Sequence, residues 1–203
     1  MAQEILRYLP SRAARVLDYG SGEALCANLV AAAAGQVLLC EAAPRIRARV
    51  ASRFADTPKI RVVAPEEVER LPAHSLDLIV LHSVVQYLTP DEAQALFALF
   101  HRLLERNGML IVSDVIPPSV PAIIDALALL RFSAANGFLI AAFGALVRTR
   151  FSGYWRLRKR IGSTRYAEVT MIDKLAGAGF SARRASKNFG HNRARMAFLA
   201  RPR

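Results

Sequence analysis

An apolar stretch that runs into two closely spaced glycines constrains the fold of this chain most. Val16-Leu17 leads to Gly20 and Gly22, and an alanine-rich run, Ala24–Ala34, then leads to Gly35. The pattern predicts a strand, a tight turn and a helix that ends at Gly35. Glycines in such a turn permit unusual dihedral angles and let a ligand approach the backbone closely. The stretch therefore predicts a ligand site at the start of a βαβ unit.

A second apolar run ends in an acidic residue. Val37–Cys40 leads directly to Glu41, which lies 19 residues after Gly22. In dinucleotide-binding folds, an acid at the tip of the second strand takes both hydroxyls of a ribose. The glycine turn and Glu41 together therefore indicate a cofactor that contains adenosine.

The residues of the turn distinguish between two such cofactors. A dinucleotide site carries G-x-G-x-x-G, but Leu25 stands at the third glycine position. The chain instead has D-x-G-x-G, formed by Asp18, Gly20 and Gly22. This pattern resembles motif I of the class I methyltransferases that use S-adenosylmethionine. A glycine turn in another kind of βαβ unit is the alternative interpretation.

The resemblance extends over nearly all of the chain and implies S-adenosyl-L-methionine as the cofactor. Its methionine side would lie at the glycine loop, and its ribose would lie at Glu41. In the family, an acid after the third strand commonly receives the adenine amino group, but Ala64-Pro65 stand there in this chain. The side chain of Glu66, or a backbone contact from Ala64 or Glu66, would take that role. The residues implied for cofactor binding are Asp18, Gly20, Ser21, Gly22, Glu41, Ala42, Ala64, Glu66 and His82.

Apolar runs and helical patterns alternate through the rest of the chain. The further predicted strands are Ile60–Val63, Leu76–Leu81, Gly108–Asp114, Ser181–Ser186 and Met196–Ala200. Thr89–Glu92 is a capping box with proline at the first helical position, and its helix is predicted to end at Asn107-Gly108. In the family, the last two strands pair as an antiparallel hairpin. The predicted fold class is α/β: a Rossmann-like, doubly wound, seven-stranded sheet, mostly parallel with a terminal antiparallel hairpin.

One segment after the fifth predicted strand interrupts this alternation. It holds two apolar helical patterns, and in the family an insertion at this place commonly covers the substrate pocket. Its longest span without charge, Phe132–Val147, has 16 residues, whereas a helix that crosses a membrane needs about 20. We therefore predict one domain, residues 1–203, in which residues 119–162 form a helical apolar insertion that is either a lid or faces a membrane.

The net charge is +12, and it comes mainly from the C-terminal half. Residues 119–167 hold eight basic side chains against one acid, and residues 181–203 hold seven and no acid. This distribution predicts an anionic partner, which could be phospholipid, nucleic acid or an acidic substrate. A general richness in arginine is the alternative. Charged residues near the N-terminus, such as Glu4 and Arg7, do not fit a secretory signal, so we predict a cytoplasmic protein.

Two residues after the fourth predicted strand are candidates for catalysis. His82 lies at the pocket end of that strand and is the first candidate for a general base, which is needed only if the acceptor must lose a proton. Tyr87 is the second candidate, as a base or as a group that orients the acceptor. The alternative for His82 is a structural hydrogen bond to a backbone carbonyl. No histidine or cysteine spacing indicates a metal site, and Cys26 and Cys40 are predicted to be small buried hydrophobes.

The sequence thus predicts a methyltransferase dependent on S-adenosylmethionine, with a small, hydrophobic or amphiphilic acceptor. Two alternatives stay open. One is an RNA methyltransferase, which the basic C-terminal half favours, although an N-P-P-Y-type motif is not present after the fourth strand. The other is a non-catalytic relative associated with a membrane, and peripheral binding at the inner face of a membrane is also compatible with the enzyme. The acceptor, the methylated element (O, N, S or C) and the oligomeric state stay open as well.

Overall fold

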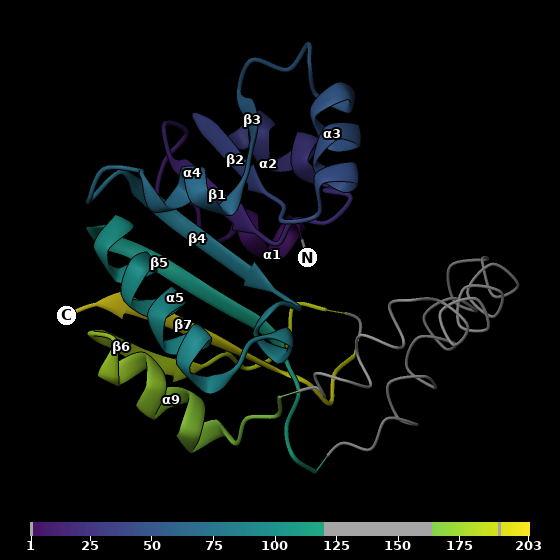
Figure 1. Ribbon diagram of the computed structural model, residues 1–203. Helices are drawn as coiled ribbons and strands as arrows, with labels where there is room; N and C mark the ends of the chain where they lie inside the picture. Colours follow the sequence, from purple (N-terminus) through teal and green to yellow (C-terminus); the bar gives the residue numbers. More distant parts are fainter. Residues whose placement is uncertain (1, 120–163, 191) are drawn as a thin grey trace, which may run out of the picture.

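The computed structural model describes residues 2–119, 164–190 and 192–203. The predicted insertion, residues 119–162, lies outside the described residues except for Ser119. Within the described part, seven strands form one sheet in the order β3-β2-β1-β4-β5-β7-β6 (Figure 1).

The first five strands run parallel, and the last two run antiparallel to their neighbours. The strands are β1 (Arg15–Tyr19), β2 (Gln36–Cys40), β3 (Ile60–Val63), β4 (Leu76–His82), β5 (Leu104–Val115), β6 (Phe180–Arg184) and β7 (Met196–Pro202). This arrangement confirms the predicted Rossmann-like sheet with its terminal hairpin. The strand order reverses between β1 and β4, and ligands of such sheets bind at the carboxyl ends of the strands beside that reversal.

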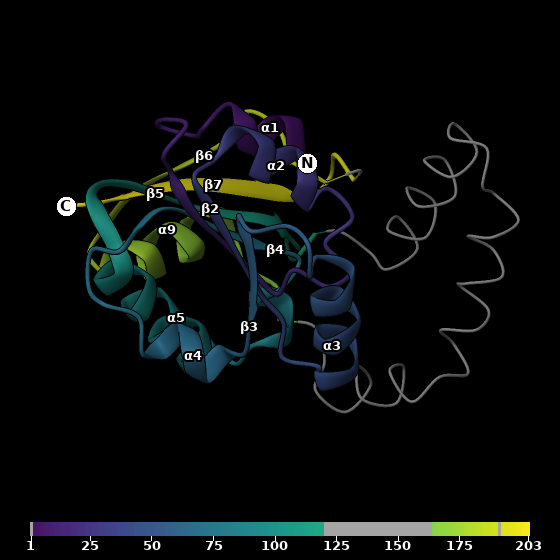
Figure 2. The same ribbon diagram turned by 90° about the horizontal axis from the view of Figure 1, so that it is seen from above.

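Helices cover both faces of the sheet (Figure 2). One face carries α1 (Ala2–Leu6), α2 (Ala27–Ala33) and α3 (Pro44–Arg53), and the other carries α4 (Pro65–Glu69), α5 (Pro90–Leu103) and α9 (Glu168–Gly177). Successive strand residues point to opposite faces, so Val16 packs in the core beneath α1 and α2, whereas Leu17 packs in the core beneath α5 and α9. Burial on both faces explains why the parallel strands are continuous apolar runs.

The helix α5 begins where the sequence predicts but ends earlier. Thr89 and Glu92 form the predicted capping box: the Glu92 amide donates to Thr89 Oγ1 over 3.2 Å, and the Thr89 amide donates to Glu92 Oε2 over 2.7 Å. The helix ends at Leu103 rather than at Asn107-Gly108. Leu104 instead pairs with Leu76 and opens β5. A pairing partner distant in sequence therefore overrides the local helical pattern.

The helix α2 begins later than its alanine-rich sequence predicts. It starts at Ala27, because the residues before it form a turn. In this turn Ala24 adopts a left-handed φ of 49°, and the Ala24 amide donates to the Ser21 carbonyl. Cys26 in that turn is exposed, which corrects the prediction of burial, whereas Cys40 is buried as predicted. The delayed start leaves an irregular segment between Gly22 and Ala27 at the edge of the ligand crevice.

Candidate active site

The glycine turn after β1 is bonded to the end of β2. The amides of Gly20 and Ser21 donate to the Cys40 carbonyl over 2.8 and 3.0 Å. The Gly22 amide donates to Glu41 Oε2 over 3.0 Å, and the Ala43 amide donates to Glu41 Oε1 over 2.8 Å. The structure therefore brings Glu41 to the glycine turn, and each of its carboxylate oxygens holds one backbone amide.

The two glycines of the turn are required for different reasons. Gly20 has a φ of +77°, and a Cβ at this position would overlap the side chain of Val84, which follows β4. Gly22 also has a positive φ, +54°, but a Cβ there would meet no atom within 4 Å. Gly20 thus permits close packing between the turn and the end of β4, while Gly22 leaves open space beside its backbone.

Arginines of α3 hold the turn from the other side. Arg49 and Arg53 both form ion pairs with Glu23, and Arg53 Nη1 also donates to the Glu23 carbonyl over 2.5 Å. Arg47 Nη1 donates to the carbonyl of Glu41 over 2.7 Å. The arginines of α3 therefore bond to the segments on both sides of the Glu41–Gly22 hydrogen bond and stabilise their position.

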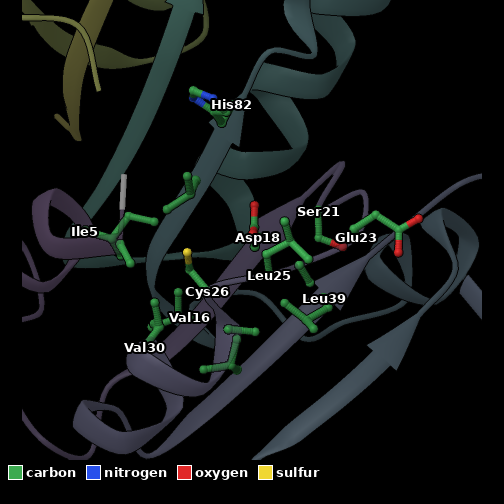
Figure 3. Close-up of a pocket in the computed structure, with 15 residues that line it drawn as sticks. Ile5, Val16, Asp18, Ser21, Glu23, Leu25, Cys26, Val30, Leu39 and His82 are labelled. Atoms are coloured by element: carbon green, nitrogen blue, oxygen red, sulfur yellow. The ribbon is translucent and has the colours of Figure 1, made fainter. Parts of the chain in front are cut away.

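A cavity of about 470 Å³ lies beside the turn, between α1, α2 and the ends of β1 and β4. Its walls are mainly apolar, and its polar lining includes Asp18, Ser21 and His82 (Figure 3). In Figure 3, Asp18 lies near the middle of the lining residues, and His82 stands apart from it at the tip of β4. Ser21 Oγ is buried, and it has no hydrogen-bond partner in the described part of the chain. Three predicted site residues thus meet in one cavity.

Asp18 is the acid of the cavity whose ionisation is most perturbed. Burial raises its pKa from 3.8 to about 7, because a carboxylate is disfavoured when protein replaces water around it. Among the described residues, no charge or hydrogen bond opposes this effect. A cationic group bound in the cavity would therefore stabilise the ionised form of Asp18.

The raised pKa makes stability depend on pH. Between about pH 4 and pH 7, folded Asp18 retains a proton that the unfolded chain has lost, so the free energy of unfolding is expected to fall as the pH rises through this window and to be insensitive to Asp18 above it. Urea unfolding at several pH values would measure the decline in the wild type, and Asp18→Asn should lack this component. An identical decline in the Asn variant would contradict the assignment to Asp18.

The remaining predicted site residues lie outside the cavity lining. The amide and carbonyl of Ala64 are used in the first turn of α4, where the amide donates to Glu67 Oε2 over 2.8 Å. Glu66 is exposed on α4, and the Ala42 carbonyl accepts from Arg47 over 3.1 Å. Tyr87 lies in η1 (Val85–Tyr87), and it is 38% exposed. The two candidate catalytic residues therefore differ in position: His82 lines the cavity, and Tyr87 does not.

The imidazole ring of His82 contacts a side chain of the neighbouring strand. Its Nδ1 lies 2.8 Å from Ser113 Oγ on the neighbouring strand β5. The next residue of β5, Asp114, bonds to Ser83, Asn188 and Arg195. No local pattern in the sequence indicates this network, although Asp114 ends a predicted strand at the same edge of the sheet as His82.

Comparison with known proteins relates part of the chain to one family. Residues 17–112 match the family described as "Methyltransferase domain", and this segment includes the glycine turn, Glu41 and His82. Comparison with curated protein sequences gave no significant match.

Solved structures share the fold. A possible exported protein from Bordetella parapertussis has a TM-score of 0.64 at 18% identity, and the match covers 99% of this chain and 65% of that chain. The YcgJ protein from Bacillus subtilis has a TM-score of 0.68 at 13% identity, with 100% and 97% covered. Magnesium protoporphyrin IX methyltransferase from Synechocystis PCC 6803, with bound S-adenosylhomocysteine, has a TM-score of 0.66 at 16% identity, with 100% and 82% covered.

The partial family match and the shared fold both point to a methyltransferase. Residues 17–112, just under half of the chain, match the methyltransferase domain family, and the described part has the α/β Rossmann-like fold of these solved structures. The chain spans 65% of the length of the Bordetella protein, less than two thirds, so what these proteins do as wholes is a separate question from the domain they share.

Proposed function

We propose that this chain transfers a methyl group from S-adenosylmethionine to a small acceptor with a hydrophobic or amphiphilic surface. The observation that carries the proposal is the position of the glycine turn. On one side Gly22 bonds to the carboxylate of Glu41, and on the other side the turn borders the cavity that contains Asp18. A ribose-binding acid and a pocket for a charged group thus flank one short loop.

The residues of the turn fit the parts of this cofactor. Each oxygen of Glu41 accepts one backbone amide and retains a further lone pair, so both oxygens are able to accept from ribose hydroxyls. Asp18 offers a carboxylate to the cationic amino group of the methionine part, and the unpartnered Ser21 Oγ offers a hydrogen bond to its carboxylate. The volume of about 470 Å³ lies within the range of small-molecule sites.

When bound, S-adenosylmethionine supplies an electrophilic methyl group on a cationic sulfur. The residues of the chain then have to hold the acceptor in line with that group and exclude water. His82 lines the cavity at the end of β4, and it is the first candidate to remove a proton from an acceptor that carries one. Tyr87, nearby in sequence and partly exposed, is the second candidate and would orient the acceptor.

The apolar walls of the cavity support an acceptor with hydrophobic surface. Ile5, Val30 and Leu39 line it, and Leu25 at its border is 82% exposed. Within residues 2–119, 164–190 and 192–203, no helix meets the length and hydropathy needed to cross a membrane. We keep cytoplasmic location and docking on an anionic membrane surface as parts of the proposal.

Binding measurements test the cofactor assignment. S-adenosylmethionine and S-adenosylhomocysteine are expected to release or absorb heat on titration into the protein, and NAD is not, because Leu25 replaces the glycine that a dinucleotide site needs. Isothermal titration with the three ligands measures this directly. Heat from NAD alone would overturn the assignment, and binding of none of them would favour the non-catalytic alternative. RNA binding that weakens steeply with salt would favour an RNA methyltransferase.

A further inference from the structure

Two left-handed residues lie side by side at the ends of β4 and β5. His82 and Ser113 are partners in the sheet register, and each is followed by a residue with positive φ: Ser83 at 58° and Asp114 at 65°. This conformation is uncommon for residues other than glycine, and it persists where surrounding contacts hold it. Ser83 Oγ donates to Asp114 Oδ2 over 2.5 Å, so the two unusual residues are joined directly.

Asp114 lies at the centre of a buried polar network. Arg195 Nη1 donates to Asp114 Oδ2 over 2.5 Å, and the two side chains are only 12% and 6% exposed, respectively. Asn188 donates to Asp114 Oδ1 over 3.0 Å and accepts from the Asp114 amide over 2.9 Å. Burial favours the protonated acid, but Arg195, Ser83, His82 and Asn188 together lower the pKa of Asp114 below its ordinary value. The network is therefore held by an ionised pair.

The loop between β6 and β7 carries Asn188 and Arg195, two of the three side chains that bond to Asp114, and lies against His82. A Cβ at Gly190 would be 2.8 Å from Asp114 Oδ1 and 3.3 Å from His82 Cε1, so only a bare backbone fits between them. The same loop contacts α1 and the turn that follows it: Lys187 pairs with Glu4 of α1 over 2.7 Å, and Phe189 stacks on Tyr8 of the turn with ring centroids 5.8 Å apart. Since α1 lines the cavity, this loop connects one wall of the cavity to the end of β4.

A contribution to folding stability does not by itself explain why an ion pair is buried. Well-packed apolar side chains of similar volume often stabilise a core as well as such a pair does, whereas removing one partner leaves an uncompensated charge. Directional polar contacts define one geometry more narrowly than apolar packing, and here they meet beside the candidate base. The pair is thus placed to define the geometry around His82.

We propose that the Asp114–Arg195 ion pair is a positioning element of the active site, which holds the β6–β7 loop against His82 and so fixes the orientation of the imidazole ring. The significance of that orientation for methyl transfer rests on the proposed function. The positioning itself does not, because the contacts exist within the chain. Asp114 and Arg195 act through the loop and are positioning residues, and neither is assigned a contact with substrate.

The test compares the wild type with Asp114→Asn, Arg195→Met and the variant that combines them. Each single change leaves one buried charge unpaired and is expected to lower the melting temperature, whereas the double variant removes both charges and is expected to recover much of it. Arg184→Gln is the matched control, because Arg184 lies in the same hairpin and its ion pair with Glu168, at 2.8 Å, is exposed.

The decisive measurement is the nuclear Overhauser effect between His82 Hε1 and the α protons of Gly190, with the histidine signals assigned by their loss in His82→Gln. We expect this effect in the wild type and in Arg184→Gln, and its loss in the folded double variant. Its persistence in that variant, or its absence from the wild type, would overturn the positioning role. S-adenosylhomocysteine affinity of the wild type is measured in parallel. Failure of the wild type to bind this ligand would instead reject the proposed function, and the histidine spectra would still decide the positioning.

Discussion

Glu41→Ala is expected to weaken S-adenosylhomocysteine binding by about ten- to a hundredfold while the chain remains folded. Charge-assisted hydrogen bonds to ribose hydroxyls contribute roughly 1.5–3 kcal/mol, which corresponds to that range. The substitution also removes the acceptor of the Gly22 and Ala43 amides, so the turn itself loses its attachment to the end of β2. Isothermal titration measures the affinity, and circular dichroism checks the fold.

Two variants serve as controls for Glu41. Glu41→Gln keeps the size and one carbonyl oxygen and should lose less affinity than the Ala variant. Glu105 lies at the start of β5, at the other end of the strands from Glu41, and it pairs with Arg15 over 2.9 Å. Glu105→Ala therefore removes an acid that is distant from the glycine turn. It should leave the affinity unchanged. Equal affinity in the wild type and in folded Glu41→Ala would move the ribose site elsewhere.

Gly20→Ala is expected to destabilise the protein by roughly 2–5 kcal/mol, which is the sum of about 1–2 kcal/mol for a left-handed conformation and about 1–3 kcal/mol for an overpacked contact. The backbone at Gly20 has a φ of +77°, and a Cβ there would overlap the side chain of Val84. The new methyl group would therefore press the glycine turn away from the end of β4. Urea unfolding monitored by circular dichroism measures the change in the free energy of unfolding.

Gly22→Ala separates the two causes. Gly22 has a φ of +54°, but a Cβ there meets no atom within 4 Å, so only the conformational cost of about 1–2 kcal/mol applies. The stability of Gly20→Ala should therefore be clearly lower than that of Gly22→Ala. Equal losses in the two variants would show that packing against Val84 contributes nothing.

Local patterns were sufficient to predict most of the sheet. The alternation of helical patterns and apolar runs predicted the five parallel strands, because a strand buried on both faces must be apolar throughout. The Thr89–Glu92 capping box located the start of α5, since that signal lies within a single turn of helix. The D-x-G-x-G turn and the spacing to Glu41 predicted a cofactor site that includes both, and the structure joins them through the Gly22–Glu41 hydrogen bond, which the sequence did not indicate.

Element ends and burial depended on partners distant in sequence. The helical pattern of α5 continues past Leu103, but Leu104 pairs with Leu76, and the pairing determines where the helix stops. The exposure of Cys26 follows from the left-handed turn at Ala24, which delays α2. The pairing of Glu23 with Arg49 and Arg53 required the packing of α3 beside the turn. None of these contacts produces a periodic pattern in the local sequence, so local patterns could not predict them.

The sequence by itself determined the class of fold, the glycine turn, and the acid at the end of β2, because each is encoded by residues within one βαβ unit. Only the tertiary structure decided what surrounds His82. Arg195 and Asp114 are 81 residues apart, and they meet because the terminal hairpin packs antiparallel against β5 and its loop crosses the ends of β4 and β5. A charged side chain in a loop carries no local sign of its partner. The partner can be identified only in the folded chain, where the sheet brings the two charges together at a largely buried site.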